Sequence, residues 1–253
     1  MSKISLLACL LLAVSSHLSA VGSFQEDPLF TLHAPIRIVT DAGFTTENGV
    51  VGGSGTLEDP YRISGWEIVV PRGKAGIHIV LVTKHFLIED NLIYSSGYPE
   101  ESDDGIKLDY SGRNGTIRNN TVRNNWIGID LVESGALIEG NVITDNWRSD
   151  TLSGGGIRVS GKFADSTLIR GNIIAGNKPF GVWRGMNVLL PQPYWSIVNA
   201  EDNYWGSPLP PSNALRVENQ VMGRHLVPLG FPLDNHVTPT VDTVPWLLAP
   251  PGR

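Results

Sequence analysis

A six-residue pattern that recurs five times between residues 88 and 205 constrains the fold of this chain more than any other feature of its sequence. Each copy contains an aliphatic residue, a charged residue, a turn-forming residue, Asn, any residue and a final apolar residue. The Asn positions are Asn91, Asn120, Asn141, Asn172 and Asn203. Their spacings of 29, 21, 31 and 31 residues are typical of a solenoid, in which each repeat forms one coil and stacks on its neighbours.

A strand-like stretch precedes each Asn, and each stretch begins with a glycine. These glycines are Gly76, Gly105, Gly128, Gly156 and Gly181. The aliphatic residues that follow alternate with polar residues, which indicates strands with one buried face. The sequence therefore predicts an all-β, single-domain, right-handed parallel β-helix of about six to seven coils, in which each strand pairs with its equivalent one coil away.

The turn residues support this architecture. The residue before each repeated Asn is Asp, Asn or Gly, and these residue types tolerate a left-handed backbone. We therefore expect the Asn side chains to point inward and to form a structural ladder from coil to coil. A second polar turn residue lies five positions after four of them, at Ser96, Asn125, Asn146 and Asn177.

Charged residues two positions before each Asn alternate in sign. They are Glu89, Arg118, Glu139, Arg170 and Glu201. In-register stacking would place opposite charges next to each other on the surface. Because an exposed pair contributes only about 0 to 1 kcal/mol, we expect this alternation to favour the correct register more than the overall stability.

The repeats define the domain organisation. We expect a signal peptide at residues 1–20, a linker at 21–33, an N-terminal cap at 34–62, the β-helix repeats at 63–206, and a C-terminal cap and tail at 207–253, which holds nine of the 17 prolines. The first 20 residues combine an early Lys3 with an apolar run and a small, serine-rich end. They predict a secreted, periplasmic or cell-surface protein. The only cysteine, Cys9, lies in this segment, so disulfides would not stabilise the mature chain.

The charge of the chain limits its partners. The formal net charge is −6, and basic residues are scattered singly along the repeats, so no basic patch is available for nucleic acid. After the N-terminal segment, no apolar stretch approaches the length of a membrane span. The sequence leaves the oligomeric state open.

Three stretches resemble a known group of proteins. They are residues 51–68 (VGGSGTLEDPYRISGWEI), residues 202–206 (DNYWG) and residues 241–247 (VDTVPWL). They resemble the secreted NosD-like β-helix proteins, which belong to the wider class of β-helix domains in carbohydrate-binding proteins and sugar hydrolases. The resemblance covers roughly residues 36–247. It implies the fold, but the group includes copper-site maturation proteins, cell-surface proteins and enzymes that act on polysaccharides.

The residue types allow these functions to be compared. A copper site needs clustered His, Met or Cys, and the histidines at positions 33, 78, 85, 225 and 236 form no tight motif. A periplasmic copper-site maturation role is therefore the second alternative. A polysaccharide lyase, hydrolase or epimerase, which needs an acid, a base and a charge neutraliser, is the first alternative. We expect instead a protein with little or no catalytic activity that binds a glycan or cell-surface polysaccharide and requires no cofactor.

Outward-facing positions supply the candidate site. The position two residues after each glycine is occupied by His78, Lys107, Asp130, Arg158 and Trp183. Asp130 should lie between Lys107 and Arg158, and these three residues are the candidates for catalysis. The same arrangement is also typical of a salt-bridge ladder on a solvated face.

Loop lengths predict where a ligand would lie. Long loops at residues 97–104 and 147–153 should flank a low coil and leave a groove between them. We expect Trp126 and Asp130 at its floor, with Trp147, Lys107 and Arg158 at its sides, a combination that suits a sugar ring and its hydroxyls or carboxylate. The alternative for the two tryptophans is to seal the edge of the core. A calcium ion at Asp103 and Asp104 is a further possibility, although an acidic loop is more often a solvated turn.

Overall fold

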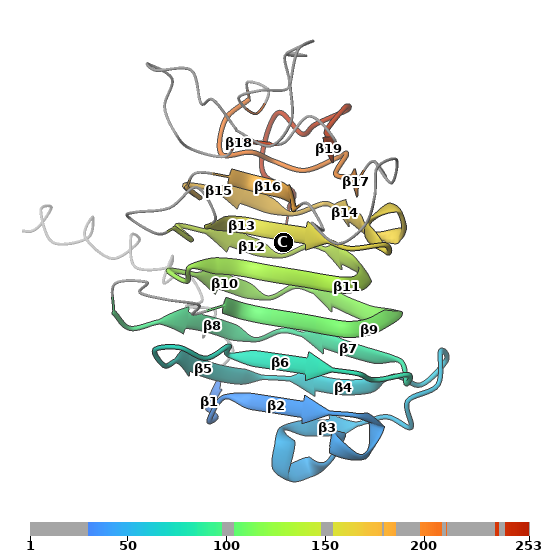
Figure 1. Ribbon diagram of the computed structural model, residues 1–253. Helices are drawn as coiled ribbons and strands as arrows, with labels where there is room; N and C mark the ends of the chain where they lie inside the picture. The colour runs from blue at the N-terminus through green and yellow to red at the C-terminus, as the bar shows by residue number, and fades with distance from the viewer. Residues whose placement is uncertain are drawn as a thin grey trace, which may run out of the picture.

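A computed structural model describes residues 30–97, 104–147, 154–178, 180–185, 198–208, 211, 236–237 and 241–252 (Figure 1). The signal peptide expected at residues 1–20 lies outside this part of the chain. The helices within it are three short 3₁₀ turns, η1 (Asp41–Gly43), η2 (Thr46–Asn48) and η3 (Ala164–Ser166). None of the described helices is long and apolar enough to cross a membrane.

Strands dominate the described chain and form two sheets. The six-stranded sheet A contains β1 (Thr31–Leu32), β5 (Trp66–Val70), β8 (Leu92–Ser95), β10 (Thr121–Arg123), β12 (Val142–Thr144) and β15 (Ile173–Ala175). One column of sheet B, called here the upstream half, contains β2 (Ile36–Val39), β6 (Ile77–Val80), the first part of β9 (Asp104–Arg118), the first part of β11 (Ile127–Glu139), β13 (Gly155–Ser160), β16 (Phe180–Gly185) and β18 (His236–Val237).

The downstream half of sheet B contains the remaining strands. They are β3 (Val50–Gly52), β4 (Tyr61–Ser64), β7 (Phe86–Glu89), the second parts of β9 and β11, β14 (Leu168–Arg170), β17 (Val198–Asn199) and β19 (Val241–Asp242). Every strand pair is parallel except β3 with β4. Figure 1 shows the strands stacked like rungs from β1 and β2 at one end to β19 at the other. The prediction of an all-β fold built from parallel strands is confirmed.

The core is a set of aliphatic columns that run through the stack. In the upstream half, Ile77, Ile106, Ile129, Ile157 and Val182 occupy successive coils, and each is almost completely buried. Fully burying one such side chain stabilises the fold by about 1.5–3 kcal/mol, and each column adds this contribution at every coil. The alternation of these residues with polar neighbours places the polar side chains on the outer face.

The repeated Asn residues form one buried column. Asn91, Asn120, Asn141 and Asn172 each donate from Nδ2 to Oδ1 of the next Asn at 2.9–3.0 Å, so the column ends at Asn203. The residue before each Asn has a positive φ, for example 51° at Asp90. This left-handed turn directs the amide inward. At the other end of the column, the backbone N–H of Trp66 donates to Oδ1 of Asn91 at 3.0 Å.

A second Asn column was missed by the sequence analysis, which treated its members as polar turn residues. Asn125 donates from Nδ2 to Oδ1 of Asn146 at 3.2 Å, and Asn146 donates to Asn177 at 2.9 Å. All three are completely buried. The fixed distance of five residues from each first-column Asn was the available signal. Burial of this turn depends on the packing of both sheets, which a sequence period does not reveal.

The ends of the stack extend the sheets beyond the regular pattern. β1 pairs with β5, and β2 pairs with β6, so residues 31–33 already belong to the stack and not to the expected linker. At the other end, Trp246 packs against the hydrophobic core, and the N–H of Leu247 donates to the carbonyl of Asn203 at 2.9 Å. Both ends therefore place apolar side chains against the terminal coils.

Charged residues before the Asn column form separate pairs. Arg118 contacts Glu89 at 2.7 Å, and Arg170 contacts Glu139 at 3.0 Å. The strand register also aligns Glu139 with Arg118, but these two residues make no ion pair among the described contacts. The coil alignment predicted from the sequence is confirmed by the Glu139–Arg170 pair.

Candidate functional site

The outer face of the upstream half of sheet B carries one row of six residues, called here the outer row. The strand register aligns Arg37, His78, Lys107, Asp130, Arg158 and Trp183. Five intervals at the usual strand spacing make this row roughly 24 Å long. The sequence analysis identified five of its members. Arg37 was missed, although its position between Ile36 and Ile38 in an alternating strand was a sufficient signal to align it with His78.

Asp130 occupies the middle of the outer row and is completely buried. Arg158 donates to its two oxygens, from Nε at 2.6 Å and from Nη2 at 2.5 Å. Lys107 Nζ lies 3.8 Å from Asp130 Oδ2. The expectation that Asp130 forms an exposed groove floor is therefore wrong, because the long side chains of Lys107 and Arg158 cover it. Asp130 instead holds two cations in position.

Lys107 connects three carboxyl groups. Besides Asp130, its Nζ lies 3.7 Å from Asp104 Oδ2 and 4.0 Å from Asp109 Oδ2. His78 Nε2 lies 2.7 Å from the same Asp109 oxygen. The sequence analysis did not identify Asp109, because this residue lies two positions beyond the outer row and joins it only through Lys107 and His78.

Asp104 is a buried carboxyl group of this cluster whose pKa differs from that of a free aspartate. It is 2% exposed, and its Oδ1 has no hydrogen-bond partner among the described residues. Burial, with a further contribution from the negative charge of Asp130, raises the pKa of Asp104 to about 8. Asp104 therefore carries a proton at neutral pH and can donate a hydrogen bond.

The calcium possibility does not fit this geometry. Asp103 lies outside the described residues, and Asp104 faces the ammonium group of Lys107. A buried, protonated carboxyl group beside a lysine is a poor ligand for a hard divalent cation. The described residues contain no group of three or more His, Cys, Asp or Glu side chains that could hold a metal ion.

A cavity of about 610 Å³ opens beside this cluster, between β2, the turn at residues 71–75 and the start of β9. Its polar wall is formed by Arg37, Lys74, His78, Asp104 and Lys107, and its apolar wall includes two prolines and two alanines. The side chains of Arg37 and Lys74 are exposed, and the described residues provide no ion-pair partner for either. The cavity is therefore locally cationic in a chain whose net charge is −6.

The other end of the outer row is aromatic. The ring of Trp183 stacks on Phe180 with centroids 5.7 Å apart and an interplanar angle of 19°. The guanidinium carbon of Arg158 lies 5.7 Å from the Trp183 ring centroid. Trp183 is partly exposed, so the outer row changes from cationic to aromatic along the stack.

Trp126 and Trp147 are the two indoles expected in the groove, and Trp126 directly precedes Ile127, which the strand register aligns with Asp104. Both are partly exposed, and Trp147 forms a parallel bridge with Lys178. None of the ion pairs, hydrogen bonds and ring contacts of Lys107, Asp130 and Arg158 among the described residues involves either indole. Residues 98–103 and 148–153, which were expected to wall the groove, lie outside the described part of the chain.

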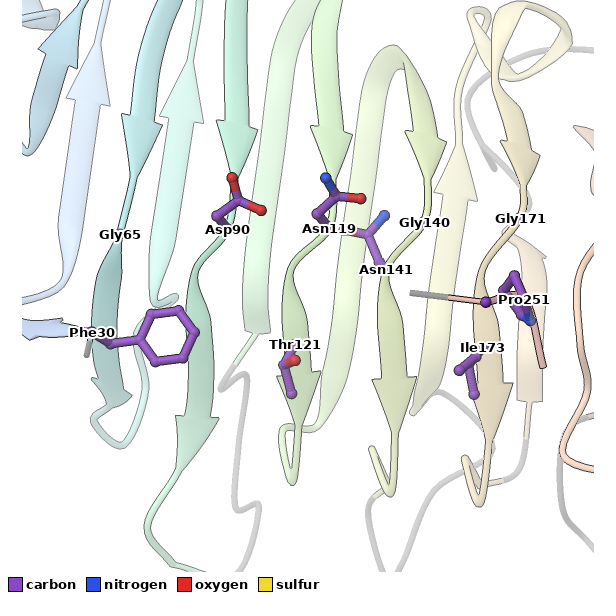
Figure 2. A pocket seen from close by; sticks show the side chains of 11 residues that line it. Phe30, Gly65, Asp90, Asn119, Thr121, Gly140, Asn141, Gly171, Ile173 and Pro251 are labelled. Carbon is purple, nitrogen blue, oxygen red and sulfur yellow. The ribbon is translucent and has the colours of Figure 1, made fainter. Parts of the chain in front are cut away.

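A second hollow of about 570 Å³ lies at the turns that precede sheet A (Figure 2). Figure 2 shows it bounded by Phe30 at one end and Pro251 at the other, with Asp90, Asn119 and Thr121 between them. Glycines and turn backbone form much of its wall, and no cationic side chain lines it. Unlike this hollow, the cavity at β2 and β9 is lined by cationic side chains.

Comparison with known proteins identifies the family of the fold. Residues 50–188 match the family model described as the right-handed β-helix region. The chain belongs to the right-handed β-helix family. No curated protein and no solved structure matches the chain. Membership of the right-handed β-helix family agrees with the parallel coils of both sheets, and any function must be argued from the outer row and the cavity beside it.

Proposed function

We propose that this right-handed β-helix protein binds a glycan or cell-surface polysaccharide along its outer row. The observation that carries the proposal is the row itself. A cationic cavity lies at one end, a partly exposed Trp183 lies at the other, and paired charges hold the side chains between them. A glycan suits this surface because its rings stack on aromatic side chains and its polar groups bond to charged ones.

The central ion pairs support binding because they orient the side chains in advance. Arg158 is held by two short hydrogen bonds to Asp130, and this bond pair also fixes the guanidinium beside Trp183. A surface that is ordered before binding loses less conformational entropy when the ligand arrives. The outer row lies on strands and not on loops, so its spacing is set by the stack.

The place of action follows from the N-terminal segment. We propose that residues 1–20 act as a signal peptide and that the mature protein works outside the cytoplasm, in the periplasm, at the cell surface or as a secreted protein. A polysaccharide of the cell surface would then be directly accessible. Membership in the NosD-like group remains part of this proposal.

Binding to a glycan array, followed by titration of each hit, tests the proposal. Arg37→Ala and Trp183→Ala alter the two ends of the outer row and should each weaken binding about tenfold, which corresponds to about 1.4 kcal/mol. Arg170→Ala is the matched control, because Arg170 is an exposed arginine that pairs with Glu139 away from the outer row. Equal binding by all four proteins, or no binding to any glycan, would contradict the proposal.

A second candidate function is acid–base chemistry on the same polysaccharide, as in a lyase, hydrolase or epimerase. The observation that favours it is the proton held by Asp104 beside the negative charge of Asp130. An assay for new reducing ends and for unsaturated products on uronic-acid polymers separates this function from binding alone. Turnover that is abolished by Asp104→Asn would favour the enzyme, whereas binding without turnover would favour the binding protein.

A further inference from the structure

The hollow at the turns that precede sheet A, called here the trough, follows the axis of the stack (Figure 2). Its lining includes one turn residue from each of five successive coils, namely Gly65, Asp90, Asn119, Gly140 and Gly171. Four intervals at the usual strand spacing make this part of the trough roughly 19 Å long. Its shape therefore suits an elongated occupant.

The wall of the trough on the side of sheet A is largely apolar. The strand register aligns Leu92, Thr121, Val142 and Ile173 in one outward-facing row, and all four are partly exposed. Thr121 and Ile173 line the trough directly. Among the described lining residues, only Asp90 is charged. A partly exposed aliphatic row beside an elongated hollow favours a chain segment with apolar side chains as the occupant.

The chain itself reaches both ends of the trough. Pro251 and Gly252 of the C-terminal tail line one end, and Phe30 lies at the other (Figure 2). The N–H of Thr31 donates to the carbonyl of Gly65 at 2.9 Å, so Phe30 belongs to the first of the five coils. Residues 21–29, which lie outside the described part of the chain, therefore connect to the trough at its open end.

We infer that residues 21–29 dock along the trough as an extended strap and close it. The length fits, because nine extended residues span at most about 30 Å. Phe24 stands six residues before Phe30, which corresponds to about 20 Å of extended chain. Phe24 therefore reaches the last of the five coils and packs against Ile173.

The composition of the strap agrees with this placement. Val21, Phe24 and Leu29 are apolar, and their contact with the wall removes both surfaces from water. Pro28 favours an extended backbone at its own position and at Asp27. Because the strap is already tethered at Phe30, it docks without the loss of translational freedom that a second copy or a separate partner would incur.

A single cysteine in the trough reports whether it is covered. The chain from residue 21 onwards contains no cysteine, so Thr121→Cys introduces one thiol. Its rate of modification by N-ethylmaleimide is measured in the protein of residues 21–253 and in one that begins at Phe30. The strap should slow the reaction at least about tenfold. Leu81→Cys is the matched control, because Leu81 is 55% exposed on the turn after β6 and should react equally in both proteins.

Two substitutions in the full-length strap avoid any effect of shortening the chain. Phe24→Asp removes the anchor and should restore fast modification of Thr121→Cys. Gln25→Asp is its matched control, because successive side chains of an extended segment point to opposite sides. It adds the same charge on the side away from the wall and should leave the protection in place.

A disulfide tests the direction in which the strap runs. Glu26 has the same side-chain direction as Phe24 and stands four residues before Phe30, so it should lie near Val142. Glu26→Cys with Val142→Cys should form a disulfide within one molecule at least about tenfold faster than Glu26→Cys with Leu81→Cys. Peptide mapping with and without reductant identifies the bond.

Three results would overturn the inference. Equal modification of Thr121→Cys with and without residues 21–29 would show that the strap does not cover the trough. Protection that is lost on dilution, or a disulfide that joins two molecules, would assign the trough to a second copy of the chain. Failure of the Val142 pair to react faster than the Leu81 pair would exclude this path for the strap. None of these results depends on the glycan-binding function, which concerns the outer row on sheet B.

Discussion

The inner Asn column and the outer row run through the same coils, yet they differ in composition. The inner column has Asn at five successive positions, and each amide bonds to the next. The outer row has six residues of five different types over a similar number of coils. Both columns use the same one-coil spacing, so backbone geometry does not account for the difference.

The difference reflects where hydrogen bonds can be completed. Inside the turn, water is excluded, and an amide side chain can both donate to one neighbour and accept from the other, so repetition of Asn satisfies every coil. On the outer face, solvent or a ligand can satisfy the side chains, and their identity is free to vary. A buried column of identical residues therefore stabilises the fold. Ligand binding is instead expected at a column of varied residues beside a cavity.

Among the substitutions compared at one pH, removing one amide side chain from the inner column should lower the free energy of unfolding the most. Asn141→Ala deletes the donors to Ile117 and Asn172 and the acceptor for Asn120. Because at least two buried groups lose their partners, we expect a loss of about 4 kcal/mol in the free energy of unfolding, measured by urea denaturation. Asn114→Ala, which removes one exposed bond to the Thr83 carbonyl, is the control. A loss below about 1 kcal/mol would show that the column is not a principal source of stability.

Removing the carboxylate at the centre of the outer row should lower the free energy of unfolding somewhat less than Asn141→Ala does. Asp130→Ala leaves Arg158 and Lys107 without their shared carboxylate, and we expect a loss of about 3 kcal/mol, since both cations retain some access to water. It should also lower the pKa of Asp104, because one cause of the increase is removed. Denaturation and a carboxyl NMR titration measure the two effects. An unchanged pKa for Asp104 would show that burial alone raises it.

The pH dependence of stability offers a sharper test of the outer row. The pKa of Asp104 is raised from its ordinary value of 3.8 to about 8, so the folded state retains a proton that the unfolded state loses. The associated stability is fully present below pH 3.8 and is lost as the pH rises towards 8, with a slope of up to about 1.4 kcal/mol per pH unit.

Asp104→Asn should remove this contribution, and the difference between the two denaturation profiles isolates it from other titrating groups. Asp165→Asn serves as the control, because the carboxylate of Asp165 is exposed and pairs with Arg113 elsewhere on the surface. Parallel profiles for the wild type and Asp104→Asn would mean that Asp104 is ionised in the folded protein.

The smallest effect is expected for the charge pairs beside the inner column. Arg170 and Glu139 have side chains 52% and 31% exposed, so solvent screens their interaction. Arg170→Ala should reduce the free energy of unfolding by less than about 1 kcal/mol, and moderate salt should reduce the difference further. A double-mutant cycle with Glu139→Ala measures the pair directly. A coupling energy above about 2 kcal/mol would show that these pairs stabilise the stack more than exposed ion pairs do.

Much of the stack could be predicted from the repeat, but less of the candidate site. The positions of Asn91 to Asn203 define the coils, and the residue two after each glycine places Lys107, Asp130 and Arg158 in one row. The second Asn column was not predicted, because its burial depends on how the two sheets close around it. The groove at Trp126 and Trp147 was inferred from loop length, and it stays a prediction because residues 98–103 and 148–153 lie outside the described part of the chain.

The sequence by itself determined the period, the strand faces and the order of charges, because these follow from local backbone geometry and from hydrophobic alternation. Only the tertiary structure decided what the outer row can do. Stacking buried Asp130 beneath Lys107 and Arg158, excluded water from Asp104, and brought Arg37 and Lys74 to the same cavity. These features depend on residues from five separate strands and turns, and the desolvation that alters the proton affinity of Asp104 exists only when those elements are assembled.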